Sequence, residues 1–593
     1  MKTDEASMGR RLLGTISLAV LASLPALCAR AAQSENKPAA CPSGDPGITL
    51  PSGFCATIFA DKIGHARHIA VADNGVVYVN TWSGRYYGKR GKTHEGGFLV
   101  ALQDKNGDGA ADVVERFGET PESGGSGGTG VGFYDGAVYA EERDRIVRYA
   151  LSTGDVAPKA KPEIVISGLP VTGDHPMHPF VIDANGNLYL DSASATDSCQ
   201  AENRMPESPG LTPCKELETR GGVWRYDAKK RDQKFSPAER FATGIRNAEG
   251  LTVEGDRIYA TQHGRDQLAE NWPKLYTAQQ GADLPAEELL ELREGADYGW
   301  PECYYDGFQK KLVLAPEYGG DGGKKVGVCA EKQGPIAAFP AHWAPNALLA
   351  YRGGQFPTAY HGGFFIAFHG SWDRAPFPQS GYNVVFQPAK DGKPAGDFIA
   401  FADGFAGGAK EPGGAAHRPS GLAQGPDGAL FVSDDTNGRI WRITYHGDIA
   451  QGLEAAPAPA QTTARAKEAG PPEGVNPEAG ALEGKSLPVP PGATDAQVAL
   501  GERIFNGHAA GGTCAGCHGA NGKGAPLAPD LTSGKWLWSD GSLKSIREVI
   551  AQGVAKPKEY RSPMPPKGGA QLSDSDVTAV AAYVWAIGHQ NKK

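Results

Sequence analysis

Short apolar runs separated by turn residues recur through the first three quarters of the chain. Each copy has an apolar run, a turn of Asp, Asn or Gly, and a second apolar run that carries an aromatic residue. The copies lie at residues 71–78, 133–139, 182–189, 253–259, 360–365 and 425–431. Asn-Gly and Asp-Gly pairs supply the positive φ angles that tight hairpins require, so the pattern predicts six β-hairpins.

Six hairpins at spacings of roughly 50 to 100 residues indicate the blades of a β-propeller. The 81 glycines and 44 prolines also favour a turn-rich β fold. Closure of the ring requires the strand near residues 54–58 to complete the last blade near residues 440–443. The widest gap between copies holds a predicted helical insertion around residues 285–292, and insertions of this size usually build a binding site or a docking surface.

The pattern changes after residue 445. Residues 449–494 are rich in Ala, Pro, Gly and Glu and almost lack aromatic residues, which is typical of an extended linker. Helical periodicity follows, and it predicts a first helix over residues 497–505 and a last helix over residues 573–587.

The helical segment contains the motif Cys514-Ala515-Gly516-Cys517-His518. Two cysteines two residues apart, with a histidine directly after the second, form an attachment site for c-type haem. Each thiol can add to one vinyl group, and His518 then ligates the iron. Met564 stands between prolines and is the predicted second axial ligand. A zinc knuckle or a CxxC redox pair is the alternative, but zinc needs two more ligands, and His508 and His589 are poorly spaced for that.

The N-terminus has the pattern of a cleaved export signal. Arg10-Arg11 precede an apolar run over residues 12–27, and small residues follow at the cleavage positions. The run is short for a membrane span and no other segment is a candidate, so the mature protein is predicted to be periplasmic without a transmembrane segment.

Six further cysteines form three couples that are local in sequence. Disulfide-bonded loops in an oxidising compartment would have this spacing. The preferred pairing is Cys41–Cys55, Cys199–Cys214 and Cys303–Cys329, although six cysteines allow fifteen pairings.

These signals divide the chain into four parts. We expect a signal peptide (1–31), a propeller (41–448), an Ala/Pro-rich linker (449–494) and a cytochrome c domain (495–593). The predicted fold class is an all-β six-bladed β-propeller with a C-terminal all-α, class I-like cytochrome c domain. The formal net charge of -9 is mild and no basic run is present, which argues against a nucleic-acid partner.

Six short motifs occur in the propeller segment in a fixed order. They are Asp174-His175-Pro176-Met177-His178, the run from Gly244 to Leu251, Asp297-Tyr298-Gly299-Trp300-Pro301, Ala344-Pro345-Asn346, the run from His369 to Arg374 with Gly381-Tyr382, and the run from Arg418 to Leu422. In this order they resemble quinoprotein sugar dehydrogenases of the sorbosone dehydrogenase branch. This branch is related to soluble glucose dehydrogenases that use pyrroloquinoline quinone (PQQ). The resemblance covers about residues 50–445, and the cytochrome is a separate module.

The resemblance implies a PQQ site at one mouth of the propeller. His175 aligns with the family's general base, which takes the substrate hydroxyl proton as hydride leaves for the quinone. PQQ has three carboxylates and an ortho-quinone, so its site needs cations, donors and flat neighbours. Residues of these types in the motifs are Arg246, Asn247, Trp300, Trp372, Arg374 and Arg418. By residue type alone, His175 fits a turn and the two tryptophans fit a core. His178 departs from the arginine of many relatives, which leaves this blade's cofactor contacts open.

A separate polar loop spans residues 104–112. Asp104, Asn106 and Asp108 offer oxygens at alternate positions and Asp112 follows, which matches a calcium loop of EF-hand or dockerin type. A polar hairpin is the alternative. The family resemblance also implies a calcium ion held against PQQ, whose ligands the sequence does not indicate.

Together these features predict a PQQ-dependent dehydrogenase for a sugar or a related alcohol or aldehyde. Electrons would pass from PQQ to the protein's own haem, and then to a soluble cytochrome or a terminal oxidase. Two other classes stay open. A calcium-dependent propeller hydrolase, such as a lactonase, leaves the haem without a purpose. A non-catalytic docking propeller that carries a haem leaves His175 and Arg246-Asn247 without a purpose.

Overall fold

The computed structural model describes residues 41, 45–81, 96–119, 128–374, 377–408, 410, 415–458, 487–506, 510, 514–519, 522–524, 528–560, 563–570 and 572–590. The predicted export signal, residues 1–31, lies outside this set, and so does most of the predicted linker. Within the set, no helix combines the length and the hydropathy that crossing a bilayer requires.

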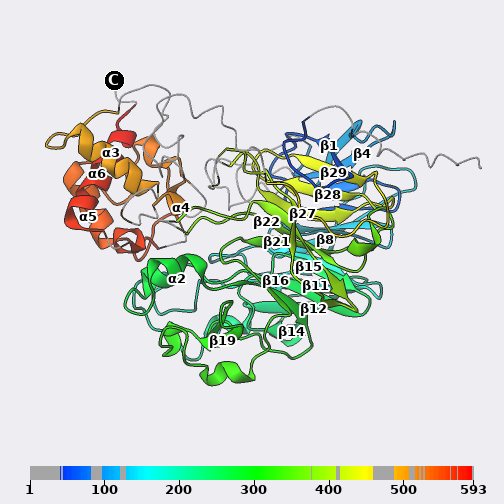
Figure 1. Cartoon of the computed structure of the whole chain (residues 1–593), viewed down its shortest axis with the longest axis horizontal. Coiled ribbons are helices and arrows are strands. Elements are labelled where there is room, and N and C mark those ends of the chain that lie inside the picture. The colour runs from blue at the N-terminus through cyan, green and yellow to red at the C-terminus, as the bar shows by residue number, and fades with distance from the viewer. Residues whose placement is uncertain are drawn as a thin grey trace, which may run out of the picture. The chain divides into compact units, whose positions relative to one another are not determined.

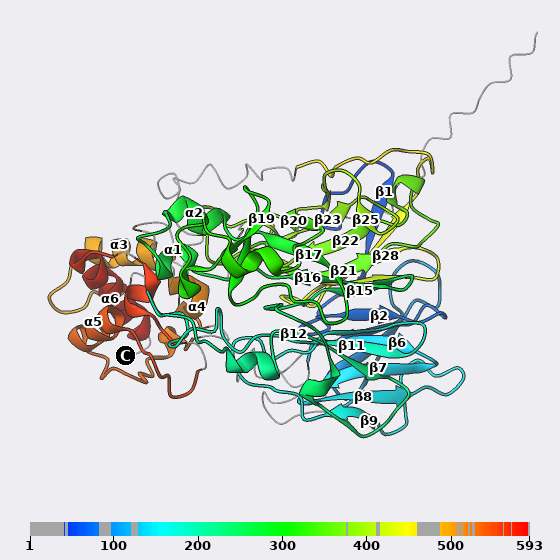
Figure 2. The same cartoon turned by 90° about the horizontal axis from the view of Figure 1, so that it is seen from below.

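Six sheets of four main strands make up the β part, and one of them has a short fifth strand. The first two sheets are β2 (Ile69–Val71), β3 (Val77–Asn80), β4 (Leu99–Gln103) and β5 (Val113–Phe117), then β6 (Val131–Tyr134), β7 (Ala137–Glu142), β8 (Arg145–Ala150) and β9 (Glu163–Ser167), with β13 (Gln233–Lys234) at the edge. The third and fourth are β10 (Phe180–Ile182), β11 (Asn187–Ser192), β12 (Gly222–Asp227) and β14 (Arg240–Thr243), then β15 (Leu251–Glu254), β16 (Arg257–Gln262), β17 (Glu287–Leu292) and β20 (Ala337–Phe339). The last two are β21 (Pro345–Ala350), β22 (Phe364–Phe368), β23 (Asn383–Gln387) and β26 (Ile399–Ala402), then β27 (Pro419–Gln424), β28 (Leu430–Asp434), β29 (Ile440–Tyr445) and β1 (Phe54–Ala60). Figure 2 shows β6, β7, β8 and β9 side by side in sequence order. The six-bladed propeller is confirmed.

The last blade joins both ends of the propeller segment. Strand β1 pairs antiparallel with β29, with Ala56 opposite Ile443 and Ile58 opposite Trp441. Figure 1 shows β1 beside β29 and β28. The ring closure predicted from the sequence is therefore confirmed.

Local turn chemistry explains why the hairpins form where they do. Between β10 and β11, the backbone N–H groups of Asn185 and Asn187 donate to Asp183 Oδ1 at 2.9 and 2.8 Å. Gly186 follows at φ +91°, a conformation that other residues rarely adopt. Leu188 and Leu190, which follow the turn in β11, are fully buried. The turn and the apolar pattern therefore favour the same pairing register between β10 and β11.

The helical insertion predicted around residues 285–292 is wrong. Residues 287–292 form β17, which pairs with β16 and β20 and is buried at five of its six positions. Glu and Leu favour helix locally, but a partner strand on each side overrides that preference. The α-helices described in this insertion are short and lie earlier, at α1 (Leu268–Asn271) and α2 (Ala278–Asp283), and the hairpin β18 (Cys303–Asp306) with β19 (Lys311–Leu314) follows.

The three sequence-local disulfides are confirmed. Cys41 bonds to Cys55, Cys199 to Cys214, and Cys303 to Cys329.

The C-terminal domain is helical, as expected. Its helices are α3 (Asp495–Phe505), α4 (Cys514–His518), α5 (Leu543–Gln552) and α6 (Asp574–Gly588), and Figure 1 shows α3, α5 and α6 packed together. Both predicted terminal helices are present. Thr494 and Ser573 begin them with capping boxes, which satisfy backbone N–H groups at each start.

Candidate functional site

Residues at the ends of strands from different blades contact one another across the propeller's central channel. Arg67, just before β2, pairs with Glu249, just before β15, at 3.3 Å. Arg67 also pairs with Asp435, just after β28, at 2.8 Å. Residues of all six innermost strands line a cavity of about 350 Å³. One mouth of the propeller therefore collects the segments that carry most of the predicted site residues.

His175 precedes β10 at this mouth and is 8% exposed. Its Nδ1 lies 3.0 Å from the carbonyl oxygen and 3.0 Å from the hydroxyl of Ser194. Since a carbonyl only accepts, this contact places the hydrogen on Nδ1 and leaves the lone pair on Nε2. Nε2 has no hydrogen bond to a described residue.

The electrostatic environment of His175 disfavours its charged form. Burial, together with the positive charges of Arg246 and Arg204, lowers the pKa of His175 to about 3. The ring is therefore neutral at ordinary pH and can accept a proton only at Nε2.

Arg246 lies at the centre of a buried ionic cluster. One of its terminal nitrogens is 2.7 Å from Asp197 and 2.7 Å from Asp266, and the other donates to the Gly264 carbonyl at 2.9 Å. Its Nε donates to the Asp197 carbonyl. The guanidinium is thus bound by protein acceptors on both edges, which the sequence did not indicate.

Arg374 and Arg418 are also bound within the protein. Arg374 pairs with Asp283 in α2 at 3.2 Å and donates to the Ala282 carbonyl. Arg418 donates to the carbonyls of His369 and Gly370, at 2.9 Å each. Their roles as PQQ ligands stay predictions, and either role requires donors beyond these bonds.

Asn247 differs from the three arginines, because it is buried and its side-chain amide has no hydrogen bond to a described residue.

The two predicted site tryptophans differ in burial and in their contacts. Trp300 is buried and donates from Nε1 to the Asp197 carbonyl at 2.9 Å. Trp372 is half-buried, with the Arg204 guanidinium 6.0 Å from its ring centre.

The haem motif lines a single apolar cavity in the helical domain. Cys514 and His518 of α4 line it together with Met564, and its volume is about 120 Å³. Its other apolar lining residues include Phe505, Leu531, Trp536, Ile546, Ile550, Tyr560, Val580 and Val584. This apolar lining around a histidine and a methionine suits a flat, apolar cofactor.

Both predicted axial ligands are held in place by backbone contacts. His518 Nδ1 lies 3.1 Å from the Pro529 carbonyl, which leaves Nε2 as the nitrogen available to iron. Met564 and Val554 exchange two backbone hydrogen bonds of 3.0 and 2.7 Å. Neither Cys514 nor half-buried Cys517 belongs to the three disulfides. The residues therefore fit a covalently attached haem, with the individual ligand roles as predictions.

Two family models match the chain. Residues 48–446 match the model described as TrAA12-like, and residues 498–588 match the model for cytochrome c. The chain belongs to the TrAA12-like family. A TrAA12-like domain joined to a cytochrome c domain indicates an oxidoreductase with a haem acceptor, and the resemblance drawn from the motifs is confirmed for both modules.

Solved structures share the fold of the TrAA12-like domain. A Trichoderma reesei protein of Carbohydrate-Active Enzymes Family AA12 gives a TM-score of 0.52 at 18% identity, covering 68% of this chain and 98% of that one. The PQQ domain of a pyranose dehydrogenase from Coprinopsis cinerea, in its holo form, gives 0.51 at 17% identity, covering 67% and 97%. At these identities the likeness shows the fold alone.

Curated relatives match only in part. An uncharacterized protein of Borreliella burgdorferi is 28% identical over 225 residues, which is 36% of this chain and 50% of that protein. The Cbb3-type cytochrome c oxidase subunit FixPc of Rhizobium leguminosarum bv. viciae is 38% identical over 77 residues, 12% of this chain and 26% of that subunit. The chain therefore spans about half the length of the first relative and a quarter of the second.

Several residues of the TrAA12-like site escaped the sequence analysis. Ser194 orients the imidazole of His175, while Asp197, Arg204 and Asp266 complete the ionic cluster around Arg246. None belongs to a recognisable motif. The available signal was position, since residues 193–198 directly follow β11 and residues 263–266 directly follow β16.

The loop at residues 104–112 folds around its own amides. Asp104 accepts from the N–H groups of Gly107 and Gly109 at 2.7 and 2.9 Å. Asp112 accepts from the Lys105 N–H at 2.8 Å and from the Asn106 side-chain amide at 2.7 Å. Asp108 accepts from that same amide at 3.1 Å. These bonds are compatible with both alternatives, and calcium at this loop stays a prediction.

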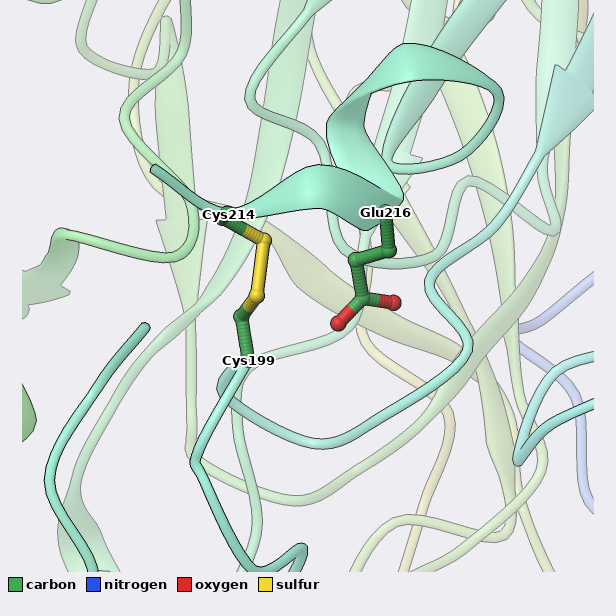
Figure 3. A group of neighbouring side chains, drawn as sticks. All are labelled: Cys199, Cys214 and Glu216. Atoms are coloured by element: carbon green, nitrogen blue, oxygen red, sulfur yellow. A yellow bond between two sulfur atoms is a disulfide. The ribbon is translucent and has the colours of Figure 1, made fainter. Parts of the chain in front are cut away.

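Another group of ligand-type residues in the TrAA12-like domain has a structural explanation. Cys199, Cys214 and Glu216 lie close together, as Figure 3 shows. Both sulfurs are consumed by the disulfide, and Glu216 accepts from the backbone N–H groups of Ala195 and Thr196. The group therefore stabilises the loop behind Ser194.

Proposed function

We propose that this protein is a quinoprotein dehydrogenase that oxidises a sugar, or a related alcohol or aldehyde, and passes the electrons to its own haem c. The observation that carries the proposal is the buried, oriented and neutral imidazole of His175 at the propeller mouth. The apolar cavity lined by Cys514, His518 and Met564 in the same chain supports it. A protein of the same fold is a pyranose dehydrogenase PQQ domain, which supports the choice of cofactor.

The residues at the mouth fit the quinone end of PQQ. His175 Nε2 and the Asn247 amide are polar groups without hydrogen bonds to described residues, and half-buried Trp372 offers a flat face. Such unsatisfied donors and acceptors in a buried site are suited to a polar ligand. The carboxylates of PQQ would need the remaining donor capacity of Arg246, Arg374 and Arg418, because most of these donors are already engaged.

When bound, PQQ supplies a two-electron acceptor for hydride. The chain's own residues handle the proton. His175 Nε2 accepts the proton of the substrate hydroxyl, while the Ser194 carbonyl holds the Nδ1 hydrogen and fixes the ring's orientation. The charges of Arg204 and Arg246 keep the imidazole unprotonated before substrate arrives, and they favour release of the proton afterwards.

The setting proposed for this reaction is the periplasm, after cleavage of the export signal. Disulfides and covalent haem are both typical of an oxidising compartment. The proposed acceptor is a soluble cytochrome or a terminal oxidase, which the similarity to a cytochrome c oxidase subunit supports.

Haem reduction on mixing with substrate tests the proposal directly. Full-length protein loaded with PQQ and calcium should show reduced haem within seconds of mixing with an aldose, a polyol or an aldehyde, while protein freed of PQQ should not. Equal reduction without PQQ would contradict the quinoprotein assignment. Lactone hydrolysis without any haem reduction would favour the propeller hydrolase instead.

The pH dependence of kcat/KM should lack a histidine limb near 6.5. Burial and two arginines lower the pKa of His175 to about 3, so the base form persists as the pH falls and is lost only near that value. We expect kcat/KM to stay within about twofold from pH 7.5 to pH 5. A tenfold fall per pH unit below 6.5 would show that a solvent-exposed histidine is the base.

Replacement of Met564 should alter the haem without affecting the propeller. In Met564→Ala the sulfur-to-iron absorption band should disappear and the midpoint potential should fall, because a thioether ligand favours reduced iron. Spectroscopy and redox titration check this, with Met177→Leu in the propeller as the control. An unchanged band and potential would rule out Met564 as a ligand.

A further inference from the structure

Three side chains of the propeller converge beside the Arg246 cluster. Asp266, His342 and Asp373 each place one ligand-type atom within 4.8 Å of the other two. They belong to three separate loops, after β16, β20 and β22. His342 is 6% and Asp373 is 4% exposed. The role proposed for His175 uses none of them.

The hydrogen bonds of His342 determine what its second nitrogen can do. Nε2 lies 2.8 Å from the Gly281 carbonyl and 3.1 Å from the Leu284 carbonyl, so it carries the hydrogen. Nδ1 lies 3.2 Å from Asp373 Oδ1. In a neutral ring this nitrogen presents its lone pair to a carboxylate oxygen, which is repulsive unless a metal ion, or a proton on Nδ1, lies between them.

In each of the two carboxylates, one oxygen accepts hydrogen bonds and the other accepts none from a described residue. Asp373 Oδ2 accepts from the Gln267 N–H at 3.3 Å, while its buried Oδ1 accepts no hydrogen bond from a described residue. Asp266 Oδ2 accepts from Arg204 at 2.9 Å and from Arg246 at 2.7 Å, while its Oδ1 accepts none from a described residue. Metal ligands are commonly oriented in this way by outer hydrogen bonds.

The charges around the cluster do not balance. Three arginines contact or closely approach five carboxylates in this part of the propeller, which leaves two negative charges while His342 is neutral. The arginines are Arg204, Arg246 and Arg265, and the acids are Asp174, Asp197, Asp266, Glu317 and Asp373. Buried charge without compensation is costly, so a divalent cation would complete the arrangement.

We propose that Asp266, His342 and Asp373 bind a divalent transition-metal ion, zinc or manganese, that ties the three loops together at the propeller mouth. One imidazole nitrogen with two carboxylate oxygens suits these ions, whereas calcium takes oxygen ligands. Three protein ligands leave further coordination positions for water. The site is separate from the loop at residues 104–112 and does not depend on the dehydrogenase reaction.

Metal binding to the complete, haem-containing protein without PQQ tests the proposal. The protein is stripped with a chelator, dialysed, and titrated with Mn²⁺ alone while free Mn²⁺ is followed by electron paramagnetic resonance. A parallel sample is loaded with Zn²⁺, desalted and analysed for bound metal. We expect about one ion per chain and a higher melting temperature for the loaded protein.

Matched variants locate the ion. Asp373→Asn and His342→Gln should weaken Mn²⁺ binding at least tenfold, whereas Asp104→Asn should bind as the wild type does. If one of the first two variants does not fold, the other supports the same comparison. A wild-type chain that binds no ion would overturn the proposal, and Asp373 with His342 would then be an ion pair held by a proton. Binding that survives both ligand variants but is lost in Asp104→Asn would overturn it as well.

Discussion

In the His175→Ala variant, reduction of the haem by sugar in PQQ-loaded protein should fall by roughly 10²–10⁴-fold, the loss typical of removing a positioned general base. The loss is expected because the variant removes Nε2, the proposed proton acceptor. The Ser194 carbonyl holds Nδ1 of His175, and no other described side chain contacts this carbonyl. Folding, haem content and reduction of the haem by dithionite should be unchanged. Stopped-flow recording of the haem band after mixing gives the rate.

A surface histidine provides the control for this experiment. His446 is exposed and contacts Thr444, so His446→Ala should reduce its haem at the wild-type rate. Wild-type rates in His175→Ala as well would remove His175 from the mechanism. A slow rate together with a lowered melting temperature would point to a structural role instead.

The Arg246→Met variant should be destabilised by about 3–5 kcal/mol, because it leaves buried carboxylates without their partner. Arg246 is 2% exposed and binds Asp197 and Asp266 at 2.7 Å each. Denaturant unfolding followed by circular dichroism measures the loss. The same variant should also shift the pKa of His175 upward, since one of the charges that lowers it is gone.

Arg225→Met is the matched control, because Arg225 also bridges a carboxylate with two nitrogens, Glu294 at 2.8 and 2.9 Å, but the two side chains are 38% and 64% exposed. Exposed pairs contribute little, so its unfolding curve should overlay the wild type. If Arg246→Met instead unfolds like the wild type and only needs more PQQ, the guanidinium serves the cofactor and not the scaffold.

Much of the fold could be predicted because its signals are local. An Asp-Asn-Gly turn specifies a hairpin within a few residues, as at Asp183 and Gly186, and six such hairpins imply a ring. The segment 287–292 shows the limit of local reasoning. Its composition favours helix, but pairing with β16 and β20 makes it a strand, and that pairing involves residues up to about 50 positions away.

The candidate site also has residues that the sequence predicts and residues that only the folded chain brings together. The motif around His175 could be found in the sequence, and so could the haem motif, because haem attachment requires fixed spacing within five residues. The partners of Arg246 could not, since Asp197 and Asp266 lie 49 and 20 residues away and belong to no motif. The convergence of Asp266, His342 and Asp373 spans more than a hundred residues of sequence.

The sequence by itself determined which chemical groups this protein has, which hairpins form and where the haem-attachment motif stands, because these follow from covalent order and from contacts between near neighbours. Only the tertiary structure decided what each group does. Folding the ring brings the loops of different blades to one mouth, where burial and neighbouring charges set the protonation of His175 and bind the Arg246 guanidinium within the protein. Electrostatic interactions depend on distance in space, and distance along the chain does not predict it.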